Sequence, residues 1–357
     1  MESRYTLPPT EERTARRAQR EAARQKRKQA QRRRLLRRLL PVMALVLILA
    51  AGLTVRTVRH HAKAPETDPV QLQVKHDLPK ERPAEAPPFS AVQSADTVHL
   101  GEDFPSGYAV LIDVDSGLIL AEKQADTPFC PASMTKILTL LVAVEELTDL
   151  DAAVTITREI TDFCYRNGCS VVGYGAGDVV SVRELLYGTI LPSGADASLA
   201  LALHISGSQE AFVALMNQKL EELGLSESAR FTNCVGLYEQ GHVCTAYDMA
   251  VILKTALENP LCREVLSTKR YTSAVPFPNY PEGQPLSNWF LRRIEDKDTG
   301  GVEVIAAKTG YVAESGSCAA SYGEDKDGHG YLCVTGSAYS AWRAIYDHVA
   351  LYWTYCN

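Results

Sequence analysis

The sequence predicts a mixed α/β domain of the α+β type, in which helices pack on an antiparallel sheet and a helical lobe stands beside it. β-branched and small residues at 108–120 and 302–311 predict strands near both ends of residues 105–357. Apolar residues at helical spacing occupy the interval between them, for example at 137–144 and 197–205. A length of about 250 residues suits one compact domain with a sizeable core.

The N-terminal segment predicts a membrane anchor and its orientation. Residues 1–38 contain fourteen Lys or Arg and four Glu, whereas the rest of the chain carries 23 basic and 39 acidic residues. Residues 39–55 form an uncharged, almost wholly apolar run that is just long enough to cross a bilayer core. Because the basic block lies on one side only, the positive-inside rule makes residues 1–38 a cytoplasmic tail. We therefore expect a single-pass protein of the cell membrane, with an extracytoplasmic domain.

The flanking segments agree with this topology. No clear small-x-small cleavage site follows residue 55, which favours an uncleaved anchor over a removed signal peptide. Contact with nucleic acid or the ribosome is another reading of the basic block. Because the basic block lies directly against the apolar run, its role as a topology signal is enough to explain it. No nucleic-acid partner is therefore expected. Residues 56–104 are rich in Pro, charge and short polar residues without a sustained period, which predicts a flexible extracytoplasmic linker.

Ser133 and Lys136 form a candidate catalytic pair. Pro131 precedes them and apolar residues at helical spacing follow, so Ser133 is expected to open a buried helix. A separation of three residues places the lysine amine beside the serine hydroxyl. Burial and a second cation, for which Lys308 is a candidate, lower the pKa of a lysine until it can take the serine proton. Taken alone, such a pair is more often a helix start with a solvated lysine.

Ser193 lies in a predicted tight loop between two helices. Ser181 and Glu184 resemble a capping box that starts the first helix. Pro192 and Gly194 end that helix before the second one begins. A loop serine can point its hydroxyl into a cleft and pass a proton between a base and a leaving amine. Alone, such a break is usually only a turn.

Lys308, Thr309 and Gly310 follow a run of β-branched and small residues that predicts a strand beside a cleft. Gly310 lets another backbone approach closely. A peptide can add alongside as an extra strand, with Lys308 and Thr309 binding its terminal carboxylate. The N–H groups of Tyr311 and Ser133 would then complete an oxyanion hole.

The strings at 133–136, 193–195 and 308–310 resemble, in this order, the three motifs of active-site serine acyl transfer in β-lactamases and penicillin-binding proteins. From about Tyr108 to its C-terminus the chain resembles the low-molecular-mass penicillin-binding proteins, specifically the serine D-alanyl-D-alanine carboxypeptidase family of the peptidase S11 type. Residues 131–136, 185–188 and 242–249 add to the likeness. The resemblance implies a penicillin-binding-protein-like transpeptidase fold for residues 105–357, which would form a serine DD-peptidase catalytic domain.

The resemblance also implies roles. Ser133 would be the nucleophile, Lys136 the base and Ser193 a proton relay, with Lys308 and Thr309 binding the substrate carboxylate. The family reaction releases the terminal D-alanine of a peptidoglycan stem peptide through an acyl-enzyme. Stem peptides are therefore the expected partners, and β-lactam antibiotics should acylate the nucleophile as substrate mimics.

One position departs from the family pattern. The second motif usually ends in Asn, whereas this chain has Ala195 followed by Asp196. An Asn amide can hold the lysine and bind a substrate carbonyl, and a methyl group can do neither. This departure suggests one alternative, a weakly active wall-binding homologue. Another alternative is a serine β-lactamase, but that class needs a deacylating Glu on a loop, and Glu221 and Glu222 fall in a helical pattern.

His242 invites a Ser-His-Asp interpretation. It precedes Thr245, which is a predicted helix N-cap, and a structural role in the loop is favoured.

The cysteines lie on the outer side of the predicted membrane span. All nine lie beyond residue 55, where disulfides are permitted, and an odd count leaves at least one unpaired. Short spacings suggest three pairs: Cys164 with Cys169, Cys234 with Cys244, and Cys318 with Cys333. No His or Cys spacing typical of a metal site and no phosphate-binding glycine loop occurs, so neither metal nor cofactor is expected.

Overall fold

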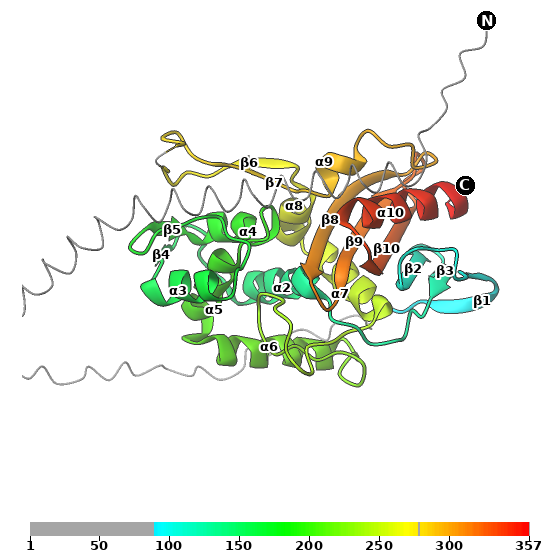
Figure 1. Cartoon of the computed structure of the whole chain (residues 1–357), viewed down its shortest axis with the longest axis horizontal. Coiled ribbons are helices and arrows are strands. Elements are labelled where there is room, and N and C mark those ends of the chain that lie inside the picture. Colours follow the sequence, from blue (N-terminus) through cyan, green and yellow to red (C-terminus); the bar gives the residue numbers. More distant parts are fainter. Residues whose placement is uncertain (1–88, 278, 357) are drawn as a thin grey trace, which may run out of the picture. The chain divides into compact units, whose positions relative to one another are not determined.

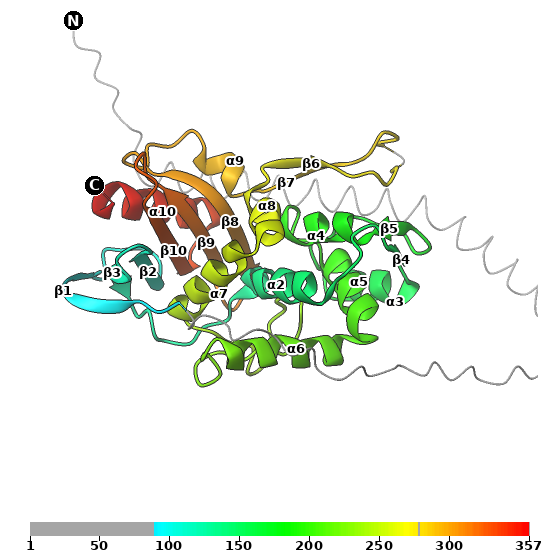
Figure 2. The same cartoon turned by 180° about the vertical axis from the view of Figure 1, so that it is seen from behind.

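The computed structural model describes residues 89–277 and 279–356. The predicted tail at 1–38, the predicted span at 39–55 and most of the predicted linker lie outside the described residues. Within the described part, helices cover both faces of a central sheet, and a helical lobe stands beside it (Figures 1 and 2). This arrangement confirms the predicted α+β fold.

The central sheet has six strands in the order β1-β3-β2-β10-β9-β8. These strands are β1 Val92–His99, β2 Tyr108–Asp113, β3 Leu118–Lys123, β8 Glu303–Val312, β9 Gly316–Glu324 and β10 Gly330–Ala338. Strands from the two ends of the domain meet where β2 pairs with β10. All neighbours are antiparallel except β1, which runs parallel to β3.

Both faces of the sheet are buried, because successive side chains of a strand point to opposite faces and helices cover each face. Val110 and Ile112 of β2 face one core, which α2 and α7 cover, whereas Leu111 between them faces a second core under α10. The helices are α2 Lys136–Glu146, α3 Arg158–Arg166, α4 Val182–Ile190, α5 Ala195–Ser206, α6 Gln209–Glu222, α7 Ala246–Glu258, α8 Pro260–Ser267, α9 Leu291–Ile294 and α10 Ala341–Tyr355.

Helices α3 to α5 gather beside α2, away from the sheet, and form the predicted lobe (Figures 1 and 2). Two small two-stranded antiparallel sheets complete the described part: β4 Ala153–Thr155 with β5 Val179–Ser181, and β6 Arg270–Thr272 with β7 Pro285–Ser287. Side chains cap most of these helices. Ser181 accepts the N–H of Glu184 at the start of α4, and Thr245 forms a reciprocal capping box with Asp248 at the start of α7.

The C-terminal end of the predicted linker at 56–104 is wrong. Residues 92–99 form β1, which the N–H of Val92 and the hydroxyl of Thr97 fasten to the carbonyls of Gly117 and Ile119. Thr97 is the one buried residue of this edge strand, so its sequence has no alternation of apolar and polar residues that would predict a strand.

All nine cysteines are free in the structure. The pairing of Cys318 with Cys333 is wrong, because Cys333 lies opposite Ser321 in the β9–β10 register, three residues from Cys318. The two thiols also belong to cores on opposite faces of the sheet. A disulfide needs Cα atoms within about 7 Å, which these positions do not satisfy. The pairings of Cys164 with Cys169 and of Cys234 with Cys244 stay predictions.

Among the described residues, no single helix has the length and apolar character needed to cross a bilayer. Helices α5 and α6 meet those criteria only when they are joined across their 87° bend.

Candidate active site

Ser133 lies in a 3-10 turn, η1 Ala132–Thr135, that leads into α2. Ala132 has a positive φ of 48°, and two glycines allow neighbouring backbone to press on it. A Cβ on Gly236 would lie 2.0 Å from the carbonyl oxygen of Ala132, and a Cβ on Gly310 would lie 2.9 Å from the nitrogen of Ser133. The loop at Gly236 and strand β8 therefore clamp the nucleophile from two sides.

Lys136 begins α2, one turn after the nucleophile. Its Nζ donates to Ser133 Oγ at 3.0 Å and to the carbonyl of Val235 at 2.5 Å, and its side chain is 1% exposed. Burial lowers the pKa of Lys136 to about 8, against the opposing effect of Cys234 and more distant acidic groups. A neutral amine is therefore accessible near neutral pH, within hydrogen-bonding distance of the nucleophile.

Ser193 and Lys308 form a second hydrogen-bonded pair in the site. Ser193 has a φ of 62° in the break between α4 and α5, and its Oγ accepts a hydrogen bond of 2.9 Å from Lys308 Nζ. Lys308 also donates to the carbonyl of Thr309 at 2.7 Å. Burial lowers the pKa of Lys308 well below its usual value, and the charge of Lys136 lowers it further.

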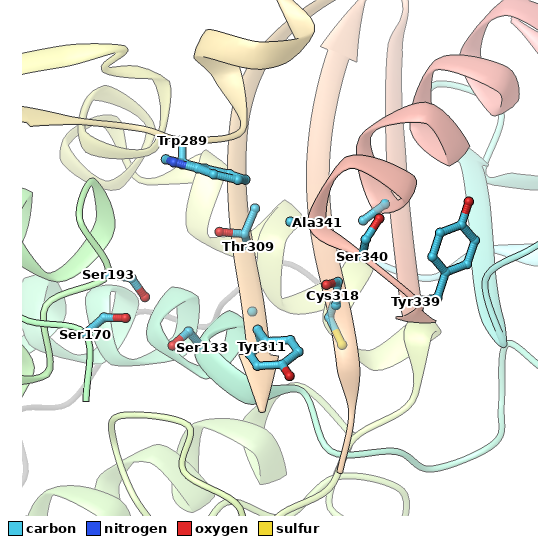
Figure 3. Close-up of a pocket in the computed structure, with 13 residues that line it drawn as sticks. Ser133, Ser170, Ser193, Trp289, Thr309, Tyr311, Cys318, Tyr339, Ser340 and Ala341 are labelled. Atoms are coloured by element: carbon cyan, nitrogen blue, oxygen red, sulfur yellow. The ribbon is translucent and has the colours of Figure 1, made fainter. Parts of the chain in front are cut away.

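Two cavities meet at the nucleophile. One, of about 490 Å³, is lined by Ser193 and Thr309 and extends to Trp289; the other, of about 450 Å³, is lined by Lys136 and Ala195. Figure 3 shows Ser133, Ser170 and Ser193 converging across from Thr309 and Tyr311 on β8. Lys308 lines neither cavity, because its side chain is buried and bonded to Ser193 and Thr309.

The structure brings all the predicted site residues together, and it adds two contacts that sequence reasoning missed. The carbonyl of Val235 holds Lys136, and the side chain of Ser170 lines both cavities. Every residue has a backbone carbonyl, so the identity of Val235 could not predict this contact. Ser170 lies between α3 and β5 in a stretch without periodicity, so no sequence signal marked it.

His242 has the structural role that the sequence favoured. Its Nδ1 accepts the N–H of Thr232 at 3.0 Å, so Nε2 carries the proton and lies 2.8 Å from Thr135 Oγ1. Thr135 in turn donates to the carbonyl of Ala132 at 2.7 Å. Burial lowers the pKa of His242 to about 4, and the neutral ring supports the nucleophile turn from behind.

Comparison with known proteins gives the same identification. Residues 93–332 match the family model described as D-alanyl-D-alanine carboxypeptidase, peptidase S11. The D-alanyl-D-alanine carboxypeptidase DacF of Bacillus subtilis is 41% identical over 150 residues, which are 42% of this chain and 38% of that protein. The D-alanyl-D-alanine carboxypeptidase of Streptomyces sp. strain K15 is 37% identical over 174 residues, 47% of this chain and 59% of that protein. The chain thus spans about two fifths to three fifths of these relatives.

Solved structures agree over a longer stretch. The crystal structure of the Streptomyces K15 DD-transpeptidase has a TM-score of 0.63 and 27% identity, covering 70% of this chain and 97% of that one. The D-alanyl-D-alanine carboxypeptidase from Mycobacterium tuberculosis has a TM-score of 0.62 and 26% identity, covering 76% and 97%. Fold, motifs and family match together place this chain in the S11 family of D-alanyl-D-alanine carboxypeptidases.

Proposed function

We propose that this protein is a membrane-anchored serine D-Ala-D-Ala carboxypeptidase that trims peptidoglycan stem peptides and binds penicillin. The observation that carries the proposal is the contact of Lys136 Nζ with Ser133 Oγ, 3.0 Å long, in a buried position that lowers the pKa of the amine. A serine hydroxyl becomes a useful nucleophile when a neighbouring base takes its proton. Family membership supplies the substrate class.

In the first half of the reaction, Ser133 Oγ attacks the carbonyl carbon between the two terminal D-alanines while its proton passes to Lys136. The carbonyl oxygen becomes negative, and the N–H groups of Ser133 and Tyr311 stabilise it. The C–N bond then breaks, and the Ser193 hydroxyl passes the proton from Lys136 to the leaving amine. D-alanine departs, and the rest of the peptide remains as an ester of Ser133.

In the second half, water attacks the ester carbonyl and gives a proton to the same base. The ester bond breaks, and the proton returns to Ser133 Oγ, so the enzyme is regenerated. The hydroxyl of Thr309 lines the cavity and is placed to donate to the terminal carboxylate. Lys308 would support this contact from behind through Ser193 and the Thr309 carbonyl.

The proposed location rests on the N-terminal segment. The basic block at 1–38 and the apolar run at 39–55 support a cytoplasmic tail and a single membrane span. The active site would then stand outside the cell membrane, where stem peptides occur.

Mass spectrometry of the full chain with a fluorescent penicillin tests the proposal. We expect one covalent adduct, mapped to Ser133, and D-alanine release from a D-Ala-D-Ala peptide. The variant Ser133→Ala should lose both while keeping its fold, because a small residue replaces a small one. Labelling that persists at another residue would refute the nucleophile, and rapid turnover of a chromogenic β-lactam would favour a β-lactamase.

A further inference from the structure

On the wall of the cleft opposite β8, the last position of the second motif lacks the amide that the family pattern places there. Ala195 offers a methyl group at the start of α5. Asp196 does not replace the amide, because its carboxylate is buried and accepts the N–H groups of Val172 and Gly173, each at 2.9 Å, and of Tyr174 at 3.3 Å. Neither side chain can therefore supply that contact to a peptide bound along β8.

Ser170 stands at this position, and the second motif holds it there. Its carbonyl accepts the N–H of Ala195 at 2.8 Å, and the next residues, 172–174, are fixed by the hydrogen bonds that their N–H groups donate to the Asp196 carboxylate. Its side chain is exposed, and its hydroxyl makes no hydrogen bond within residues 89–277 and 279–356. Ser170 is thus a free polar group on an anchored backbone.

The position of Ser170 is central to the cleft. Of the described residues, Ser133, Ser170 and Tyr311 line both cavities. Figure 3 shows the hydroxyls of Ser170, Ser193 and Ser133 facing a common space. A substrate that reaches from one cavity to the other across Ser133 must pass Ser170.

We propose that Ser170 is a substrate-orienting residue, whose hydroxyl donates a hydrogen bond to the carbonyl of the peptide bond before the reacting D-alanine. This role rests on the proposed function. A peptide paired with β8 along one edge directs its alternate carbonyl and N–H groups to the opposite wall. Ser170 supplies a donor on that wall, where Ala195 has none, and so holds the scissile carbonyl in line with Ser133.

Two β-lactams separate this contact from a structural effect. Penicillin G carries an amide carbonyl at the corresponding position, and 6-aminopenicillanic acid lacks it. In the full chain, Ser170→Ala should slow acylation by penicillin G about three- to tenfold, the effect of one hydrogen bond, and leave acylation by 6-aminopenicillanic acid unchanged. Ser170→Thr keeps the hydroxyl and should stay within about twofold of the wild type with both compounds.

A second substitution tests whether Ser170 stands in for the missing amide. Ala195→Asn should restore penicillin G acylation in the Ser170→Ala protein, and the gain should exceed that of Ala195→Asn alone. Equal slowing of both β-lactams by Ser170→Ala, or no slowing of either, would overturn the role of Ser170. A wild-type protein that reacts with neither compound would instead refute the proposed function, and the role of Ser170 with it.

Discussion

At the residue scale, the two buried lysines have different partners. Lys136 contacts the nucleophile directly, whereas Lys308 contacts Ser193 and the carbonyl of Thr309. Burial lowers the pKa of both amines, to about 8 for Lys136, so that a neutral Lys136 amine is accessible near physiological pH. In the proposed reaction Lys136 is therefore the base, and Lys308 positions Ser193, which relays the proton, and Thr309, which holds the substrate carboxylate.

The pKa of Lys136 predicts how acylation depends on pH. Below about 8 the amine is mostly protonated and cannot accept the proton of Ser133. The rate constant for penicillin acylation should therefore rise about tenfold per pH unit up to that value and then level off. Labelling rates between pH 6 and 9.5 check this, with Lys254→Ala as a surface control. A flat profile would exclude Lys136 as the titrating base.

Thr309 and Lys308 should respond differently to substitution. Thr309→Val keeps the side-chain volume but removes a charge-assisted hydrogen bond, so kcat/KM for a free D-Ala-D-Ala terminus should fall roughly tenfold or more. Activity on the amidated peptide should barely change. Lys308→Ala should lower kcat on both peptides, because Ser193 loses its partner. A wild type that hydrolyses free and amidated peptides equally would argue against carboxylate binding.

At the element scale, the site depends on how closely three backbone segments approach one another. The turn at Ala132, the loop at Gly236 and strand β8 at Gly310 leave no room for a Cβ. Such contacts fix the nucleophile more firmly than side-chain packing can, because the backbone has few ways to yield.

Gly236→Ala tests this clamp. The added Cβ would meet the carbonyl of Ala132, so the turn has to shift, and a displacement of about 1 Å can reduce the rate about a hundredfold. Gly241→Ala is a matched control, because Gly241 has a φ of 86° against 78° for Gly236 but no atom within 4 Å of its Cβ. Both variants should be less stable than the wild type, because each places a Cβ at a residue with positive φ. Only Gly236→Ala should lose penicillin labelling. Equal labelling by the two variants would show that the clamp is dispensable.

The sequence predicted elements whose side chains repeat with a period. The helix after Ser133 has this property, and the strands at 108–120 and 302–311 are marked by β-branched and small residues; all are confirmed, as α2, β2, β3 and β8. Strand β1 and Ser170 were missed, because each is exposed and held by backbone groups. The Cys318–Cys333 pairing failed because equal distance from a turn does not fix which face of the sheet a side chain takes.

At the scale of the whole molecule, the charge asymmetry predicts the topology. A protease added outside intact cells should digest the catalytic domain and spare residues 1–38, since the basic block retains the N-terminus inside. Immunoblots against each end check this, with permeabilised cells as the control in which both parts are digested. A domain that survives outside treatment would reverse the proposed orientation.

Two buried histidines give the whole domain a pH-dependent stability. His242 lies behind the nucleophile turn. His348 belongs to α10 and faces the sheet, where its Nδ1 lies 2.7 Å from Ser321 Oγ and its Nε2 lies 3.0 Å from Thr335 Oγ1. Burial lowers the pKa of His242 to about 4 and that of His348 to about 3. Both rings are neutral in the folded domain at pH 5, whereas in the unfolded chain, where the pKa is about 6.5, they are protonated.

Acidification should therefore destabilise the domain. The unfolded state binds protons that the folded state excludes, so stability is lost as the pH falls from about 6.5 toward the folded pKa values. Between pH 7 and pH 5 each histidine should reduce the free energy of unfolding by about 2 kcal/mol. Urea unfolding followed by tryptophan fluorescence measures this loss. The loss of unfolding free energy between pH 7 and pH 5 should be about half as large in His242→Gln. In His204→Gln, where the side chain is exposed, the loss should equal that of the wild type. A His242→Gln protein with the full wild-type loss would show that this histidine is not held neutral by the fold.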